Sequence, residues 1–182
     1  FLAQYEKQAK TWISSESMSV PKQGCVGLPY ALYANASAKI GFDLKKDRLF
    51  SVGDLCDRGT HSEDILDWMD YSWFIPVMGN HEVMILNHFY GYLDEHYMKK
   101  LKADWFLSLK KEQKEKVVHY FNNLPVAIEL LHKNKKYGIV HAMCPLNSWD
   151  LFKKSLYSTE KRDIANEAMW SFLGEKKIKA VS

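Results

Sequence analysis

Short apolar runs that end in glycine and a polar side chain mark the middle of the chain. The runs 48–52 and 73–78 are rich in aromatic and β-branched residues, and they stop at Gly-Asp and Gly-Asn. This pattern predicts two buried strands with polar side chains at their carboxyl ends. Further along, Pro125–Leu131 and Tyr137–Val140 are apolar runs joined by a polar segment, and this arrangement predicts a β-hairpin.

Apolar positions at helical spacing separate and follow these strands. The helices predicted from this spacing and from their capping residues run from Pro29 to Lys39, from Thr60 or Ser62 to Asp70, and over 81–93, 111–121 and 160–173. Residues 176–181 read as the start of another strand, whereas the polar segment 1–24 carries no clear element. The mixture of strands and helices predicts the α/β class.

Composition narrows the classes of function. A chain of 182 residues with a formal charge of +3 fits one globular domain and is too weakly basic to predict a nucleic-acid partner. The three cysteines form no CxxC pair, which favours a reducing compartment, and we expect the cytoplasm. The chain has no apolar run of about 18 residues, so we expect no membrane span.

The strongest candidate chemistry lies just after the first two predicted strands. Asp54, Asp57 and Arg58 follow one strand, and Asn80 and His81 follow the next. Because ligands gather at the carboxyl ends of strands in open α/β sheets, these side chains are expected at one rim. A carboxylate, an amide and an imidazole together are typical of a metal site, and a neighbouring arginine binds oxyanions.

The two motifs concerned are GDLCDRG (53–59) and GNHE (79–82). With the later text NNLPVAIEL and KKYGIVHA, they resemble the phosphoprotein phosphatase superfamily, in the small bacteriophage-lambda type of serine/threonine phosphatase. The resemblance extends over roughly 40–142. It implies a metallophosphoesterase fold, with a central β-sandwich flanked by helices. It also implies one calcineurin-like domain over 1–182, which we expect to be incomplete at its C-terminus.

The resemblance also implies a metal centre. Asp54 matches the carboxylate that bridges two metal ions, and Asn80 and His141 match ligands of the second ion. Without the resemblance, His141 would read as a structural histidine at a strand end. The resemblance implies two Mn²⁺ ions at this centre.

Three further residues match the catalytic positions of the family. His81 matches the general acid, Asp57 the carboxylate that holds its imidazole, and Arg58 the guanidinium that binds phosphate. An aspartate beside an imidazole fixes its tautomer and raises its pKa, and the fork of an arginine binds two oxygens at once.

The chain departs from the family pattern at three places. Leu28 and Tyr30 stand where the family has an acid and a histidine that bind the first metal ion. The phosphate-binding arginine that the family has soon after the tryptophan matched by Trp170 is missing, and no histidine follows His141 to supply one more metal ligand. The first ion therefore keeps only Asp54, and we expect one Mn²⁺ ion rather than two.

Two main functions remain open at this stage. The first is a metal-dependent phosphatase that acts on phosphoserine or phosphothreonine proteins or on small phosphoesters. The second is a degenerate pseudophosphatase that binds a phosphoprotein or another partner, and a prophage remnant without function is a weaker third. The tryptophans Trp68, Trp73, Trp105 and Trp170 are interpreted as packing residues.

Overall fold

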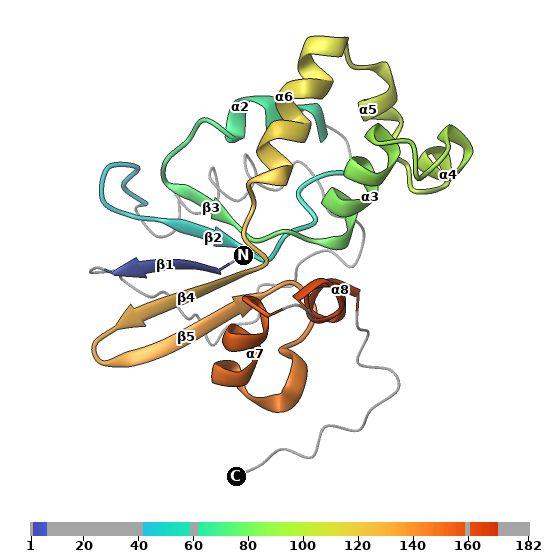
Figure 1. The fold of residues 1–182 in the computed structure, drawn as a ribbon. Coiled ribbons are helices and arrows are strands. Elements are labelled where there is room, and N and C mark those ends of the chain that lie inside the picture. Colours follow the sequence, from blue (N-terminus) through green and yellow to red (C-terminus); the bar gives the residue numbers. More distant parts are fainter. Residues whose placement is uncertain (1, 7–41, 59–61, 159–160, 171–182) are drawn as a thin grey trace.

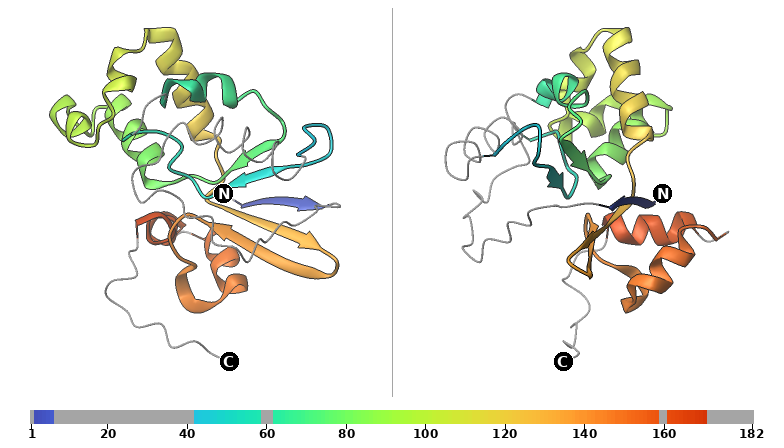
Figure 2. Two further views of the ribbon diagram at one scale, coloured as in Figure 1. Left: turned by 180° about the vertical axis from the view of Figure 1, so that it is seen from behind. Right: turned by 90° about the vertical axis from the view of Figure 1, so that its left-hand side faces the viewer.

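The computed structural model of the chain describes residues 2–6, 42–58, 62–158 and 161–170. In these residues two small β-sheets face each other, and helices cover the outer face of each sheet (Figure 1). The views from behind and from the side show the same order of layers (Figure 2). The α/β class and the central β-sandwich flanked by helices are therefore confirmed.

The first sheet carries the two glycine-rich motifs. It consists of the parallel strands β2 (Leu49–Ser51) and β3 (Phe74–Pro76). All three residues of β3 are buried, as expected of a parallel strand that is covered on both faces. The strands predicted over 48–52 and 73–78 are confirmed, and the observed strands are shorter by one or two residues at each end.

The second sheet contains β1 (Leu2–Glu6), β4 (Ala127–His132) and β5 (Lys135–Val140). β4 pairs with β5 in antiparallel register, so the predicted hairpin is confirmed, and β1 pairs with β4 in parallel. Lys133 and Asn134 close the hairpin with φ angles of 46° and 62°, the left-handed conformation of a tight two-residue turn. The sequence did not predict β1, because its five residues lie in a segment with no recognised pattern.

Apolar side chains fill the space between the two sheets. Ile75 and Val77 approach from the first sheet and Ile128 from the second, and all three are buried. The partly buried residues that complete this cluster are Phe50, Leu130 and Ile139. Burying each such side chain contributes about 1.5–3 kcal/mol, so this interior stabilises the contact between the sheets.

A helical layer covers the outer face of the first sheet. Its elements are η1 (Ser62–Asp64), α2 (Ile65–Trp68), α3 (Asn80–Phe89), α4 (Glu95–Lys100), α5 (Asp104–Ser108) and α6 (Lys111–Asn122). Met98, Phe106 and Phe121 are fully buried in its core. The helices predicted over 81–93 and 111–121 are confirmed as α3 and α6. α3 ends earlier than predicted because Gly91, with a φ of 83°, turns the chain just after the helix.

A second helical layer covers the other sheet, formed by η2 (Pro145–Asn147), α7 (Trp149–Ser155) and α8 (Lys161–Trp170). Phe152 and Ala168 are buried beneath these helices. The helix predicted over 160–173 is confirmed as far as the described residues reach. The sequence analysis did not predict α7.

A polar cluster anchors α7 to the second sheet. Trp149 Nε1 donates to Glu129 Oε2 at 2.6 Å, and Lys153 Nζ donates to the same oxygen at 2.7 Å. The hydrogen bond from Lys153 lowers the pKa of Glu129 although partial burial opposes this shift, and the same contact raises the pKa of Lys153. Gly138 lies opposite Glu129, and a Cβ there would be 2.6 Å from the Trp149 ring.

Some predictions are corrected or lie outside the described residues. Ser62 does not cap the helix predicted to reach Asp70: it lies inside the 3₁₀ turn η1, and α2 ends at Trp68. The predicted helix 29–39 and strand 176–181 lie outside the described ranges, and the single domain over 1–182 stays a prediction. Among the described helices, none has the length and apolarity needed to cross a membrane.

Candidate functional site

Two loops that follow β2 and β3 meet at the carboxyl ends of these strands. The loop over 53–58 contacts the turn over 79–82 so closely that a Cβ on Gly53 would be 2.6 Å from the Gly79 nitrogen. A Cβ on Gly79 would in turn be 2.5 Å from the Asp54 nitrogen. Glycine at both positions therefore lets the two backbones touch, which brings the polar residues of both loops together.

The first loop has an unusual backbone. Gly53, Asp54, Asp57 and Arg58 all have φ between 54° and 89°, in the left-handed region. This conformation costs a non-glycine residue about 1–2 kcal/mol, although aspartate tolerates it better than most. The cost at three non-glycine positions has to be offset by the hydrogen bonds that the loop makes.

Glu82 supplies several of these hydrogen bonds. Its carboxylate, which is fully buried, accepts the backbone N–H groups of Leu55 at 2.7 Å, Asp54 at 2.9 Å and Gly79 at 2.7 Å. Glu82 thus joins both loops through one side chain. Burial and the nearby Asp54 charge raise the pKa of Glu82, while the three N–H groups oppose this shift.

His81 and Asp57 form a buried pair at the start of α3. His81 Nδ1 donates to Asp57 Oδ2 at 2.7 Å, and the two side chains are 1% and 0% exposed. Burial alone would lower the pKa of His81, but the hydrogen bond that His81 donates to Asp57 and the charges of Asp54 and Asp57 outweigh it. The pKa of His81 is therefore raised, and its imidazole stays protonated to higher pH.

Asp57 has further partners besides His81. Trp105, from α5, donates its indole Nε1–H to the second carboxylate oxygen, Oδ1, at 2.6 Å. The backbone N–H of Asp57 donates to the Ser62 hydroxyl at 3.0 Å. Both oxygens and the main chain of Asp57 are consequently held by separate elements of the fold.

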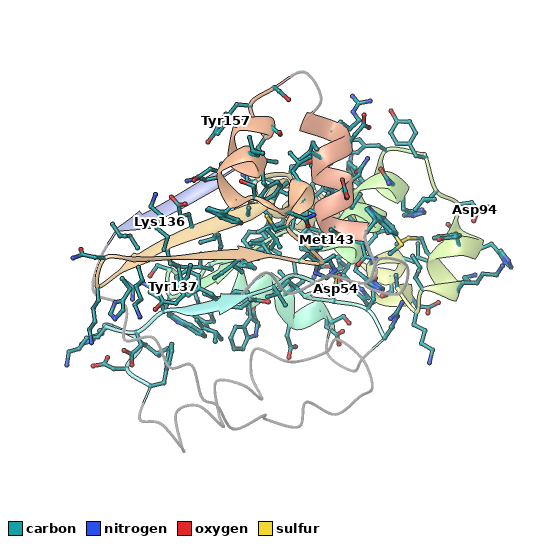
Figure 3. All side chains as sticks on the ribbon, turned by 90° about the horizontal axis from the view of Figure 1, so that it is seen from below. Asp54, Asp94, Lys136, Tyr137, Met143 and Tyr157 are labelled. Atoms are coloured by element: carbon teal, nitrogen blue, oxygen red, sulfur yellow. The ribbon has the colours of Figure 1, made fainter. Side chains whose placement is uncertain are left out.

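A second polar group lies beside this pair. His141, which follows β5, places Nε2 at 3.1 Å from Asn80 Oδ1 and at 3.4 Å from Asp54 Oδ1. Figure 3 labels Asp54 on the loop after β2, near the end of the hairpin from which His141 follows. His141 Nδ1 donates to the Val52 carbonyl at 2.6 Å. Three segments far apart in the sequence therefore converge on one point.

This second group has the chemistry of a cation site. Because His141 Nδ1 donates to Val52, the neutral imidazole would present the lone pair of Nε2 toward the Oδ1 atoms of Asp54 and Asn80, which is the form that binds a cation. When two ligand atoms bind one ion with bonds of about 2.1 Å and an angle of about 90° between the bonds, the two atoms lie about 3 Å from each other. The separations of His141 Nε2 from Asn80 Oδ1 and from Asp54 Oδ1, 3.1 and 3.4 Å, are close to this value. In the described parts of the chain, no cluster of three or more Cys, His, Asp or Glu residues is suited to a metal ion, so the amide is needed here as the third donor.

The structure brings the six residues predicted for the site to one end of the strand pair. Asp54, Asn80 and His141 form one group, and His81 pairs with Asp57. Arg58 is exposed at the rim of the same loop, and its backbone N–H donates to the Lys102 carbonyl at 3.4 Å. Leu28 and Tyr30, where the sequence lacks the first-metal ligands, lie outside the described residues.

The sequence analysis missed the roles of Glu82, Trp105 and Ser62. A signal for Glu82 was present, because a glutamate three residues after a helix N-cap commonly accepts the N-cap backbone N–H, as it does here with Gly79. Trp105 had no such signal, since it is 48 residues away from Asp57. Cys56, inside the loop, is fully buried, and burial and the surrounding carboxylates raise the pKa of its thiol well above the usual value.

The fold and the paired loops define a metallophosphoesterase. The family model described as calcineurin-like phosphoesterase matches residues 29–181, and the chain belongs to this family. Membership implies a centre of divalent metal ions.

Individual relatives are similar over much of the chain. It is 35% identical to serine/threonine-protein phosphatase 2 of Escherichia coli (strain K12) over 72% of its length, and 31% identical to serine/threonine-protein phosphatase 2 of Salmonella typhimurium (strain LT2) over 69%. It is 28% identical to a symmetrical bis(5'-nucleosyl)-tetraphosphatase of Nitrosococcus oceani over 81%. The matches span 61%, 58% and 50% of these relatives.

Proposed function

We propose that the protein is a metal-dependent phosphatase that hydrolyses phosphoserine and phosphothreonine esters. One observation carries this proposal: a donor set for a cation and a buried acid–imidazole pair stand on the same two loops. His81 Nδ1 is 2.7 Å from Asp57, while Asp54 and Asn80, which precede Asp57 and His81 on the same two loops, lie within 3.4 Å of His141. Phosphoester hydrolysis needs both kinds of group in one place.

The proposed metal ligands are Asp54, Asn80 and His141. The hydrogen bond from His141 Nδ1 to Val52 supports this assignment, because a metal-binding histidine commonly donates its other ring N–H to a carbonyl or carboxylate. The ligand set of two oxygens and one nitrogen suits Mn²⁺, which we propose as the native ion. We expect one ion in this chain, because Leu28 and Tyr30 replace the first-metal ligands of the family.

A divalent ion supplies Lewis-acid chemistry: it lowers the pKa of water and offsets the negative charge of the phosphoryl group. The chain supplies the rest. His81 gives a proton to the departing alkoxide, and Asp57, which accepts from its Nδ1–H, holds the imidazole in the required tautomer. Arg58, exposed beside the pair, is proposed to bind the phosphoryl oxygens with its guanidinium fork.

The proposed substrate class is supported by the two relatives from Escherichia coli and Salmonella typhimurium, which are named as serine/threonine phosphatases. The similarity to a symmetrical bis(5'-nucleosyl)-tetraphosphatase makes dinucleoside tetraphosphates the second class to test. We propose no nucleic-acid or membrane partner, and the cytoplasm stays the predicted location.

Turnover by the purified chain tests the proposal directly. We expect hydrolysis of p-nitrophenyl phosphate and of a phosphoserine peptide with Mn²⁺, and loss of both when Mn²⁺ is chelated. His81→Ala should lower the phosphopeptide rate by about 100-fold or more, since a general acid contributes about 10²–10⁴. Hydrolysis of a dinucleoside tetraphosphate alone would reassign the substrate, and no turnover above the His81→Ala variant would contradict the phosphatase proposal.

A further inference from the structure

Trp105 contacts the pair of His81 and Asp57 from outside the two loops that form the site. Its indole Nε1–H donates to Asp57 Oδ1 at 2.6 Å, while the other oxygen, Oδ2, accepts from His81 at 2.7 Å. We propose that Trp105 is a positioning residue for proton transfer, which holds the Asp57 carboxylate so that it can orient the His81 imidazole. This inference rests on the proposed function of the pair as the general acid of a phosphatase.

The need for such a donor comes from the geometry of a carboxylate. Rotation about the bond between Cβ and Cγ of aspartate has only broad preferences, so the side chain alone does not fix where its oxygens point. The hydrogen bond from the Asp57 backbone to Ser62 holds the main chain but leaves this rotation open. The indole N–H fixes one oxygen, and by doing so it fixes the oxygen that faces His81.

Packing alone does not explain a tryptophan at this position. Its neighbour Phe106 is 1% exposed and fills the helical core, whereas Trp105 is only partly buried at the edge of that core. The two rings meet edge to face with their centroids 5.7 Å apart. A phenylalanine at 105 could make the same ring contact, so the feature that tryptophan adds is the N–H aimed at Asp57.

The neutral charge of the indole also suits this role. A lysine or arginine in its place would compete with the imidazolium for the Asp57 charge, and a nearby cation disfavours the protonated form of His81. A neutral N–H donor holds the carboxylate while leaving its negative charge available to His81.

The dependence of the rate on the leaving group tests this proposal. A serine alkoxide needs a proton as it leaves, whereas p-nitrophenolate is stable without one. For Trp105→Phe we expect kcat to fall about 10- to 100-fold on a phosphoserine peptide but less than about threefold on p-nitrophenyl phosphate. The fall on the peptide is smaller than the full contribution of a general acid, about 10²–10⁴-fold, because His81 and Asp57 are still present. KM should stay unchanged for both substrates, because Trp105 is not proposed to touch them.

Trp149→Phe is the matched control. It removes an indole N–H bond of the same length, 2.6 Å, to the buried carboxylate of Glu129 on the other sheet. We expect it to leave the ratio of the two rates unchanged. If Trp105→Phe slows both substrates equally, or slows neither, Trp105 is a packing residue and the proposal is overturned.

Two further measurements distinguish loss of the positioning role from misfolding of the variant and from failure of the proposed phosphatase function. Replacing the Trp105 indole by the isosteric benzothiophene keeps the ring shape and removes only the N–H, and it should reproduce the rate ratio of Trp105→Phe. In proton NMR, the His81 Nδ1–H bonded to Asp57 should give a far-downfield signal. We expect that signal to shift or broaden in either Trp105 variant, whether or not the chain hydrolyses phosphoesters, and an unchanged signal would contradict the positioning role.

Discussion

Replacing Glu82 by glutamine should loosen the junction of the two loops. The carboxylate accepts three backbone N–H groups, from Asp54 and Gly79 on Oε2 and from Leu55 on Oε1. An amide has one oxygen, so Glu82→Gln can satisfy the Oε2 side while its NH₂ group faces the Leu55 N–H. One buried charge-assisted hydrogen bond is lost, and one buried donor is left opposite another donor.

The expected loss of stability follows from these contacts. A hydrogen bond to a charged group contributes about 1.5–3 kcal/mol, and an unsatisfied buried donor costs about 1–3 kcal/mol. Glutamine carries no charge to bury near Asp54, and this difference favours the stability of the variant. The raised pKa of Glu82 shows that its charged form is disfavoured at this position. We expect the lost contacts to win and the free energy of unfolding to fall by about 3 kcal/mol, a large part of the stability of a typical domain.

Urea unfolding followed by tryptophan fluorescence measures this change, with Glu115→Gln as the control. Glu115 is exposed and lies 3.9 Å from Lys111 on α6, so its replacement should alter the free energy of unfolding by less than about 0.5 kcal/mol. Under the proposed function, Glu82→Gln should also lower kcat, because Asp54 is held by the same carboxylate. A Glu82→Gln protein as stable as the control would refute the reasoning about the buried N–H groups.

Three other substitutions test the remaining geometry. His141→Ala should weaken Mn²⁺ binding at least tenfold by calorimetry, since it removes one of three proposed ligands, and unchanged affinity would exclude that role. Gly138→Ala should destabilise the protein by about 1–3 kcal/mol in thermal unfolding, because its Cβ would be 2.6 Å from the Trp149 ring. Glu129 has a lowered pKa, so its contribution to stability is present above about pH 4.5 and is lost as the pH falls through the folded-state pKa. Unfolding curves of Glu129→Gln should therefore depend less on acid pH. The raised pKa of Lys153 acts at the opposite end: its contribution is present below about pH 10.5 and is lost as the pH rises through the folded-state pKa.

Local patterns predicted the strands and the loops that follow them. β2, β3 and the hairpin of β4 and β5 were recognisable because each combines a short apolar run with turn residues at its end. Asp54 and Asn80 were predicted at one rim because parallel strands deliver their following residues to the same edge. The role of His141 depended on the resemblance, since a single histidine after a strand has no pattern of its own.

The contacts that support the site could not be predicted in this way. The hydrogen bond from Trp105 to Asp57 depends on where α5 packs, and a short helix of five residues carries little periodic signal. The attachment of α7 through Trp149 and Glu129 likewise joins residues that are distant in sequence. Such pairs arise from tertiary packing, which a single sequence does not reveal.

The buried thiol of Cys56 makes the opening of the loop over 53–58 measurable. Its side chain is fully buried beneath the loop, with Sγ 3.8 Å from Glu82 Oε1. An alkylating reagent can reach a fully buried thiol only when the structure around it opens, so the rate of labelling reports how often the native protein opens there. Mass spectrometry of the peptide that contains Cys56 would follow that rate in the presence and absence of added Mn²⁺, and slower labelling with the ion would mean that binding holds the loop closed.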